Sequence, residues 1–299
     1  MTRRFDDLTV ATTVQNNIAL CVAMLRSFDA NIGTPAGVIV IDDASEMPPH
    51  FPSFSAPLFT LRNQPAIGFC KSADRALREV QTKYALLVDA DVVFEPGDFN
   101  GGYSEFKKNN WAWANFRQTN FEGQPQDSFE HPLMPPWVFA AGNQVFAAWQ
   151  KFQRPPKPVS GERIAAVDAA HSSCALVNME AFRAVGGFDL DFWQCQSDVD
   201  LSLRLRDRGY RVGVDLGYTV KHHGAGGKSG QFARVHDLYR ARLRLYERAY
   251  PRSRKYLRPA LLVRHTLELT WFALIAPFKK DGRLRSRVEL LKGVWKGYR

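Results

Sequence analysis

The segment Tyr84–Phe94 (YALLVDADVVF) constrains the fold more than any other part of the chain. It begins with five apolar, strand-like residues, and two carboxylates, Asp89 and Asp91, follow. Side chains two positions apart in an extended backbone project to the same side, so we expect both carboxylates to converge where the strand leaves a sheet. Paired oxygen ligands suit a divalent cation, and a cation suits a phosphate-bearing substrate. Acidic pairs also occur in ordinary solvated turns, so the neighbouring sequence decides the interpretation.

The first 95 residues alternate between short apolar segments and segments with helical spacing. We predict strands at 8–14, 38–41, 58–61 and 84–88, and helices at 18–28 and 71–80. Strands that are apolar throughout and separated by helices are typical of a mostly parallel sheet covered on both faces, an α/β fold. Ligands of such sheets bind outside the carboxyl ends of the strands. Asp42, Asp89 and Asp91 all follow strand ends, and we expect them to face one crevice.

The remainder of the chain is less uniform. Residues 96–165 are predicted to be irregular, with scattered tryptophans that either bind a sugar-like surface or anchor loops to the core. Residues 171–230 are again ordered, with strands predicted at 174–177 and 210–214 and helices at 180–185 and 198–208.

The net charge of +10 belongs to the C-terminal region. Residues 231–299 carry 18 Lys and Arg against 5 Asp and Glu, whereas residues 1–230 carry 22 against 25. A near-neutral body with a basic tail predicts an anionic partner for the tail. The four cysteines lack metal-ligand spacing, which favours reduced thiols in a cytoplasmic protein, and the first residues do not read as a signal peptide.

Several blocks occur in a characteristic order between about residues 7 and 230: VIVIDDAS (38–45), NQPAIGF (63–69), YALLVDADVVFEPG (84–97), AFRAVGGFD (181–189), SDVDLSLRLRDRGYRV (197–212) and VKHHGAGGKS (220–229). Together they resemble the family 2 glycosyltransferases of the GT-A fold, in particular the bacterial rhamnosyltransferase-like branch. The resemblance implies a Rossmann-like nucleotide-diphospho-sugar transferase sandwich. It implies a catalytic domain at 1–230, with a nucleotide-sugar-binding half (1–98) and an acceptor-binding half (99–230), followed by a basic helical region at 231–299.

The resemblance also implies roles for individual residues. Asp91 is expected to contact Mn²⁺ or Mg²⁺ directly, with Asp89 binding the donor ribose or the metal's water shell, and His222 completing the metal site. His223 is the alternative to His222. The remaining implied donor contacts are Asp42 at the nucleotide base or ribose, Thr13 in the same pocket, and Lys228 near the phosphates.

Asp198 matches the general base of the inverting branch, at a helix start where the macrodipole favours its ionised form. Ser197 stands where that branch usually has glutamate, which makes the assignment of the base less secure. Trp193 and Asp200 are the expected acceptor contacts. Ordinary alternatives exist for these residues: a helix cap for Asp198 and core packing for Trp193.

The implied reaction moves a sugar from a nucleotide-sugar donor, UDP- or dTDP-linked, to a hydroxyl of a cell-envelope or lipid-linked saccharide. In the tail, residues 236–249 have the pattern of an amphipathic helix. Residues 260–278 are apolar but interrupted by Arg264, His265 and Glu268, which favours a helix in the membrane interface over one that spans the bilayer. The sequence thus predicts a cytoplasmic enzyme, peripheral on the inner face of the plasma membrane. A helical subdomain packed on the catalytic body is the alternative.

Three rival interpretations remain. A sugar-phosphate nucleotidyltransferase would carry a glycine-rich phosphate loop after the first strand, where this chain has Thr13–Asn17 (TVQNN). A non-catalytic nucleic-acid- or membrane-binding protein would explain the basic tail, but no nucleic-acid motif is present and no nucleic-acid partner is expected. Ser197 is the one hint of an inactive transferase.

Overall fold

The computed structural model describes residues 3–152, 156–224, 231–275 and 283–296. The chain forms two compact units. The first comprises Met1–His131, Pro155–Trp193 and Ser197–Gly227, and the second Pro132–Arg154, Gln194–Gln196 and Lys228–Arg299. In this division residues 132–154 group with the C-terminal helices, whereas the sequence analysis placed them in the acceptor-binding half.

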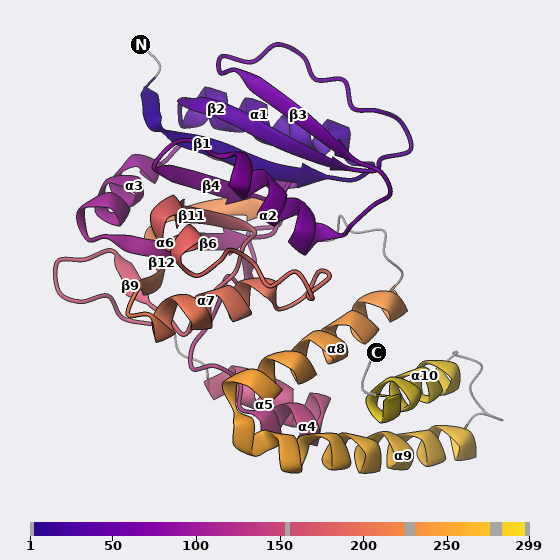
Figure 1. Cartoon of the computed structure of the whole chain (residues 1–299). Helices are drawn as coiled ribbons and strands as arrows, with labels where there is room; N and C mark the ends of the chain where they lie inside the picture. Colours follow the sequence, from indigo (N-terminus) through magenta and orange to yellow (C-terminus); the bar gives the residue numbers. More distant parts are fainter. Residues whose placement is uncertain (1–2, 153–155, 225–230, 276–282, 297–299) are drawn as a thin grey trace. The chain divides into compact units, whose positions relative to one another are not determined.

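The first unit is built on a mixed sheet, shown with its helices in Figure 1. Its strands are β1 (Arg4–Val14), β2 (Thr34–Asp43), β3 (Leu58–Asn63), β4 (Tyr84–Val88), β5 (Val92–Val93), β6 (Trp111–Thr119), β7 (Pro125–Gln126), β8 (Phe129–Glu130), β9 (Ile164–Ala166), β10 (Ala169–Ala170), β11 (Cys174–Asn178) and β12 (Arg211–His222). Its helices are α1 (Ile18–Asn31), α2 (Phe69–Glu79), α3 (Phe99–Lys108), α6 (Met179–Ala184) and α7 (Ser197–Asp207).

The main sheet runs in the order β3-β2-β1-β4-β11-β6-β12-β5, with β7 paired to β6 and β9 paired to β12. Strands β3, β2, β1 and β4 are mutually parallel, as are β6 and β12, and β11 lies antiparallel between these two groups. The α/β fold class and the mostly parallel sheet predicted from the sequence are confirmed. The parallel strands end at one edge, which collects the polar residues that follow them.

The principal core fills one face of this sheet. Alternate residues of β1, among them Leu8 and Val10, pack with Met24 and Phe28 of α1 and with the aromatic residues of α3. Phe28, Phe94 and Phe99 meet edge to face, as Phe5 meets Tyr103, an arrangement that aromatic quadrupoles favour. Helix α2 contacts β1 and β2, and Figure 1 shows α1 behind these strands and α2 in front of them.

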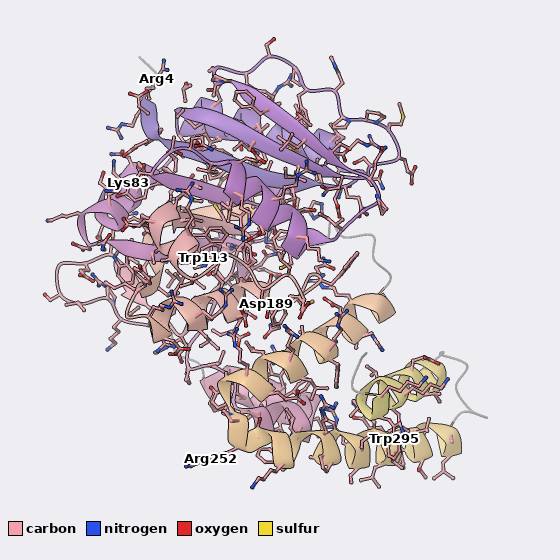
Figure 2. The ribbon with its side chains drawn as sticks, viewed as in Figure 1. Arg4, Lys83, Trp113, Asp189, Arg252 and Trp295 are labelled. Carbon is pink, nitrogen blue, oxygen red and sulfur yellow. The ribbon has the colours of Figure 1, made fainter. Side chains whose placement is uncertain are left out.

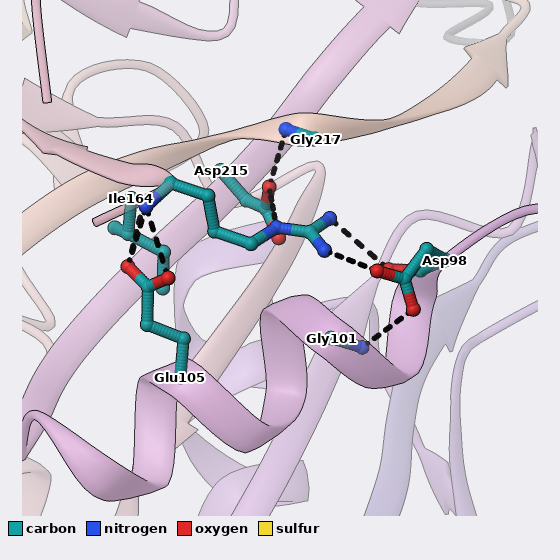
Figure 3. Close-up of polar contacts among 7 residues, drawn as sticks. Asp98, Gly101, Glu105, Ile164, Asp215 and Gly217 are labelled. Carbon is teal, nitrogen blue, oxygen red and sulfur yellow. Dashed lines mark hydrogen bonds and ion pairs between the residues drawn. The ribbon is translucent and has the colours of Figure 1, made fainter. Parts of the chain in front are cut away.

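A partly buried ionic network connects α3 to Asp215 in β12, and Figure 3 shows it. The Arg163 guanidinium pairs with Asp215 Oδ1 at 3.0 Å and with Asp98 Oδ2 at 2.6 Å, while Glu105 accepts the backbone N–H groups of Arg163 and Ile164. Burial raises the pKa of Asp215, and the Gly217 N–H and Arg163 oppose that rise. The network lies beside the register shift between Asp215 and Thr219, which re-aligns β12 before its last residue, His222.

Residues 96–165 and the segment after residue 214 contain more regular secondary structure than the sequence predicted. Residues 96–165 contain α3 and β6, and β12 runs eight residues past the predicted end at 214. Strand β6 buries its tryptophans in the core, so Trp111 and Trp113 are not loop residues. Asp215 and Gly217 obscured the second part of β12 because they interrupt its apolar pattern. An added Cβ at Gly213 would lie 2.7 Å from atoms of Trp111 and Ile164, so only glycine fits there.

The second unit is helical. It consists of α4 (Pro136–Ala141), α5 (Asn143–Phe152), α8 (Gln231–Ala249), the short 3₁₀ helix η1 (Pro251–Lys255), α9 (Leu257–Ile275) and α10 (Arg283–Lys296). Helix α9 packs against α4 and α10, and its buried residues Leu257, Leu261 and His265 face inward. No helix in the described part of the chain combines the length and apolar character needed to cross a membrane.

Candidate metal and active site

Two carboxylates and an imidazole converge at the carboxyl edge of the sheet. Asp89 directly follows β4 and Asp91 directly precedes β5. Strand β5 pairs with the end of β12, where Val92 lies opposite His222, and the His223 N–H donates to the Asp91 carbonyl at 3.1 Å. The short β5 strand thus brings the D-x-D turn to a histidine more than a hundred residues away in sequence.

The three side chains have the geometry of a cation site. His222 Nε2 lies 3.3 Å from Asp91 Oδ1 and 3.6 Å from Asp89 Oδ2, and the three ligand atoms all lie within 4.8 Å of one another. Ligands at about 2.1 Å from an octahedral ion lie about 3 Å apart when adjacent, so these residues fit such an ion with small adjustments. Carboxylate oxygens suit Mn²⁺ or Mg²⁺, whereas an imidazole nitrogen is a ligand that transition metals prefer.

Without a cation, burial and mutual repulsion shift the carboxyl pKa values in this cluster. Burial raises the pKa of Asp89 to about 7, His222 opposes this rise, and the charges of Asp91 and Asp198 reinforce it. Burial also acts to raise the pKa of Asp91, but the hydrogen bond and charge of His222 outweigh it and hold that pKa below its usual value. One carboxyl therefore retains a proton near neutral pH, and a divalent cation would replace that proton.

Gln118 of β6 orients the histidine. The side chain of Asn115 accepts from the Phe116 N–H and donates to the Ser128 carbonyl, which fixes its oxygen toward Gln118. Gln118 Nε2 donates to that oxygen at 3.2 Å, so Gln118 Oε1 faces His222 Nδ1 at 3.1 Å. An oxygen can only accept, so Nδ1 carries hydrogen and Nε2 is the nitrogen directed at the carboxylates.

The two residues that precede β11 connect the separate parts of the site. The Ser173 carbonyl accepts from the Asp89 N–H at 2.9 Å, and Ser173 Oγ accepts from Gln118 Nε2. The Ser172 N–H donates to Asp198 Oδ2 at 3.0 Å. Asp198 lies in the first turn of α7, and its other oxygen accepts from the Val199 N–H at 2.9 Å. Its carboxylate is thus held in one orientation on the same side of the sheet as Asp89.

The predicted donor residues lie at neighbouring strand ends. Thr13 is partly exposed near the end of β1, and Asp42 lies at the end of β2, opposite Val14. Asp42 is fully buried, accepts from the Ser45 N–H at 3.0 Å and pairs with Arg62 at 3.2 Å. A direct contact between Asp42 and a nucleotide therefore requires movement of Arg62 or of the turn after β2.

Asp43, the residue after Asp42, holds the segment 63–68. Its oxygens accept from Asn63 Nδ2 and from the N–H groups of Ile67 and Gly68, all at 2.8–2.9 Å. With both oxygens engaged, Asp43 positions the loop that precedes α2.

The predicted acceptor residues differ in their surroundings. Trp193 is 45% exposed and its indole lies over Gly68, where an added Cβ would come within 2.8 Å of the ring. Asp200 is 1% exposed and pairs with Arg204 at 2.7 Å, which also donates to the Val185 carbonyl. That pairing gives Asp200 a structural role inside the fold, and its contact with the acceptor stays a prediction.

Two further predicted residues lie apart from the cluster. The His223 ring packs 5.5 Å from the Phe121 ring and is exposed, so of the two histidines the structure brings His222 to the carboxylates. Lys228 lies outside the described residues. Gln118, Ser172 and Ser173 were not predicted. No local pattern distinguishes them, because their roles arise from the pairing of β6 and β11 with β4 and β12.

Comparisons with known proteins bear on the fold. No protein-family model matches the chain. A stretch of 52 residues is 42% identical to the O-antigen biosynthesis protein RfbC of Myxococcus xanthus, covering 17% of this chain and 4% of RfbC. The chain thus matches only a small fraction of that curated relative.

Solved structures match over most of the chain. The mannosyltransferase PcManGT from Pyrobaculum calidifontis, in complex with GDP-Man and Mn²⁺, is similar with a TM-score of 0.54 and 16% identity over 98% of this chain and 87% of PcManGT. GalNAc-T7 with UDP, GalNAc and Mn²⁺ has a TM-score of 0.52 and 11% identity over 82% and 51% of the two chains. TarS residues 1–349 of S. aureus has a TM-score of 0.50 and 12% identity over 98% and 91%. With this sheet order and these neighbours, the chain has the GT-A fold of glycosyltransferases.

Proposed function

We propose that this protein is a metal-dependent glycosyltransferase that moves a sugar from a nucleotide-sugar donor to a hydroxyl of a saccharide acceptor. The observation that carries the proposal is the convergence of Asp89, Asp91 and His222 beside a fixed carboxylate, Asp198, at the carboxyl edge of the sheet. This arrangement supplies a cation site and a separate proton acceptor, which are the two groups that sugar transfer from a diphosphate needs.

Each residue has a distinct proposed role. Asp91 and His222 hold the cation, with Asp89 supporting it, and Gln118 keeps Nε2 of the imidazole available. When bound, the cation neutralises the charge that develops on the diphosphate leaving group. Asp198 takes the proton from the acceptor hydroxyl. The acceptor oxygen then bonds to the anomeric carbon, the bond from that carbon to phosphate breaks, and the nucleoside diphosphate leaves with inversion of the anomeric centre.

The donor and acceptor are proposed by class. A UDP- or dTDP-sugar follows from the resemblance, with Thr13 and Asp42 beside the base and ribose. A cell-envelope or lipid-linked saccharide is proposed as acceptor, and the short identity with an O-antigen biosynthesis protein supports that choice. Trp193 offers an exposed indole face against which a sugar ring packs well. The Lys228 contact and the cytoplasmic location stay predictions.

Calorimetric titration of the purified protein with UDP-, dTDP- and GDP-sugars, with and without Mn²⁺, tests the proposal. We expect one donor class to bind only when Mn²⁺ is present, and the same donor to support transfer. Asp91→Ala should abolish both while thermal unfolding shows an intact fold, and Asp6→Ala, at an exposed surface carboxylate paired with Arg4, serves as the matched control. Near-normal turnover of Asp91→Ala would remove Asp91 from the metal site, and absence of binding across the panel would contradict the donor assignment.

A further inference from the structure

Helix α9 in the second unit exposes apolar side chains and buries ionisable ones, the reverse of the usual pattern of a helix on a water-exposed surface. Its side chains Val263, Leu267, Trp271 and Leu274 recur at spacings of four, four and three, so they lie on one face, which we name the α9 outer face. Each of them is between 61% and 67% exposed. The residues between them that project in the same direction are uncharged, among them Thr266 and Thr270.

Three ionisable side chains in the middle of the same helix, Arg264, His265 and Glu268, face inward. Arg264 pairs with Glu268 at 2.9 Å and donates to the Phe139 carbonyl at 3.0 Å. His265 is fully buried, with Nδ1 at 3.3 Å from Glu268 and its ring 5.2 Å from that of Tyr239. A helix that buries its charges and exposes its aliphatic and aromatic residues loses free energy in water unless something apolar covers the exposed face.

The charges around the α9 outer face indicate what covers it. Arg252 and Lys255 of η1 lie just before α9, and Lys292 and Lys296 of α10 are also exposed. Figure 2 shows Arg252 near the start of α9, and Trp295, which is 77% exposed, beside that helix. The acidic residues described in this unit, Asp237, Glu247, Glu268 and Glu289, are all partly buried.

We propose that the α9 outer face inserts into the headgroup region of an anionic phospholipid membrane, with the surrounding lysine and arginine side chains at the phosphates. Apolar and tryptophan side chains on one side of a helix, bordered by cations, are the features of interfacial helices. A second copy of the chain fits less well because it would bring two strongly basic surfaces together. RNA would satisfy the cations but would leave the aliphatic face exposed to water. The inference is independent of the transfer chemistry.

Flotation of the full-length protein with lipid vesicles tests this inference. We expect flotation with phosphatidylcholine vesicles that contain phosphatidylglycerol, much weaker flotation with phosphatidylcholine alone, and a reduction when salt is raised. Leu267→Ser and Trp271→Ser should each lower the vesicle partition coefficient about tenfold, equivalent to about 1.4 kcal/mol, because each removes apolar surface that the bilayer would bury. Phe59→Ser on β3 is the matched control, since Phe59 and Trp271 are both 62% exposed.

Further measurements separate this inference from the alternatives. Exposed positions carry little packing, so the variants should unfold at the temperature of the parent protein and keep transfer to a water-soluble acceptor. Brominated lipids should quench tryptophan fluorescence, and Trp271→Phe should remove part of that quenching. The inference is overturned if the parent protein does not float, or if the face variants float like the parent. It is equally overturned if the protein does not bind vesicles and Trp271→Ser either dissociates a dimer or abolishes RNA binding in a gel mobility-shift assay.

Discussion

The contact between Gln118 and His222 gives the sharpest prediction for the metal site. Gln118→Leu keeps a side chain of similar size in the core but removes the oxygen that accepts from Nδ1, 3.1 Å away. Gln118 is only 3% exposed, so water is poorly placed to replace that oxygen. We expect the imidazole to lose its fixed tautomer and orientation, and the nitrogen directed at Asp89 and Asp91 to become a poorer ligand.

The size of the effect follows from the role of the hydrogen bond. Loss of a partner that orients a metal-bound histidine weakens metal affinity by about 10- to 100-fold, equivalent to about 1.4–2.7 kcal/mol. That range agrees with the cost of about 1–3 kcal/mol for leaving a buried donor without an acceptor. The same substitution removes the donations from Gln118 to Asn115 and Ser173, so we expect an additional loss of unfolding free energy that does not depend on metal.

Two comparison variants separate metal affinity from stability. Gln118→Glu keeps an oxygen toward Nδ1 but removes the N–H groups that reach Asn115 and Ser173. It should therefore retain Mn²⁺ affinity within about threefold while lowering stability. Asn178→Ala removes a buried amide from β11 at its far end, opposite Tyr84, where Asn178 caps α6. It should lower unfolding free energy by about 1 kcal/mol and leave Mn²⁺ binding unchanged.

Electron paramagnetic resonance of free Mn²⁺, with calorimetry as a second method, measures the affinity directly and does not rely on turnover. Thermal unfolding in the absence of metal supplies the stability of each variant. A dissociation constant for Gln118→Leu within twofold of the parent value would refute the reasoning. Equal weakening by Asn178→Ala would refute it too, because the effect would then reflect general loosening of the sheet.

Three further predictions concern the site and its surroundings. The raised pKa of Asp89, about 7, means that Mn²⁺ must displace a proton, so Mn²⁺ affinity should rise about tenfold per pH unit below pH 7 and level off above it. The folded protein binds this proton more tightly than the unfolded chain, so the unfolding free energy without metal should fall as pH rises from about 4 to 7. In Asp89→Asn, neither the Mn²⁺ affinity nor the unfolding free energy should show this dependence on pH. Asp198→Asn should lower kcat by about 10²- to 10⁴-fold in steady-state assays without changing Mn²⁺ affinity, and a normal kcat would exclude Asp198 as the base. Gly68→Ala should lower the unfolding free energy by about 2–4 kcal/mol, because φ is +85° and the new Cβ would meet Trp193. The control Gly123→Ala, at φ +80° with nothing within 4 Å, should lower it by only about 1–2 kcal/mol. Equal losses in the two variants would show that the Trp193 indole moves aside at no cost in free energy.

The sequence predicted the parts of the fold that depend on local pattern. The apolar segments that became β2 and β4 are buried on both faces, and the polar residues directly after them lie at the carboxyl edge. The family resemblance favoured His222 and left His223 as the alternative; in the structure it is His222 that lies beside the carboxylates. These features can be predicted because the end of a strand and the residues that follow it depend on only a few neighbouring positions in the sequence.

The features that were missed depend on pairing between distant segments. Gln118 lies in a strand whose tryptophans were assigned to loops, and its contact with His222 exists only because β6 and β12 run in parallel with a shifted register. The resemblance implied that Asp200 contacts the acceptor, and that contact stays a prediction. In a helix, side chains two positions apart point in different directions, and Asp200 turns inward to Arg204.

The backbone groups of Ser172 and Ser173 would keep the proposed base and the proposed cation site at a fixed separation. The Ser172 N–H binds Asp198, and the Ser173 carbonyl binds the Asp89 backbone, so the two carboxylates are joined through two consecutive residues. Backbone groups carry no net charge and do not titrate, so this connection persists whichever of the acidic groups is protonated. In the proposed reaction the acceptor oxygen and the leaving phosphate lie on opposite sides of the anomeric carbon. The base and the cation must therefore keep their spacing while charge moves between them, and side-chain ion pairs alone would shift as their charges change. The two residues before β11, which carry none of the proposed reacting groups, thus set the distance on which the proposed chemistry depends.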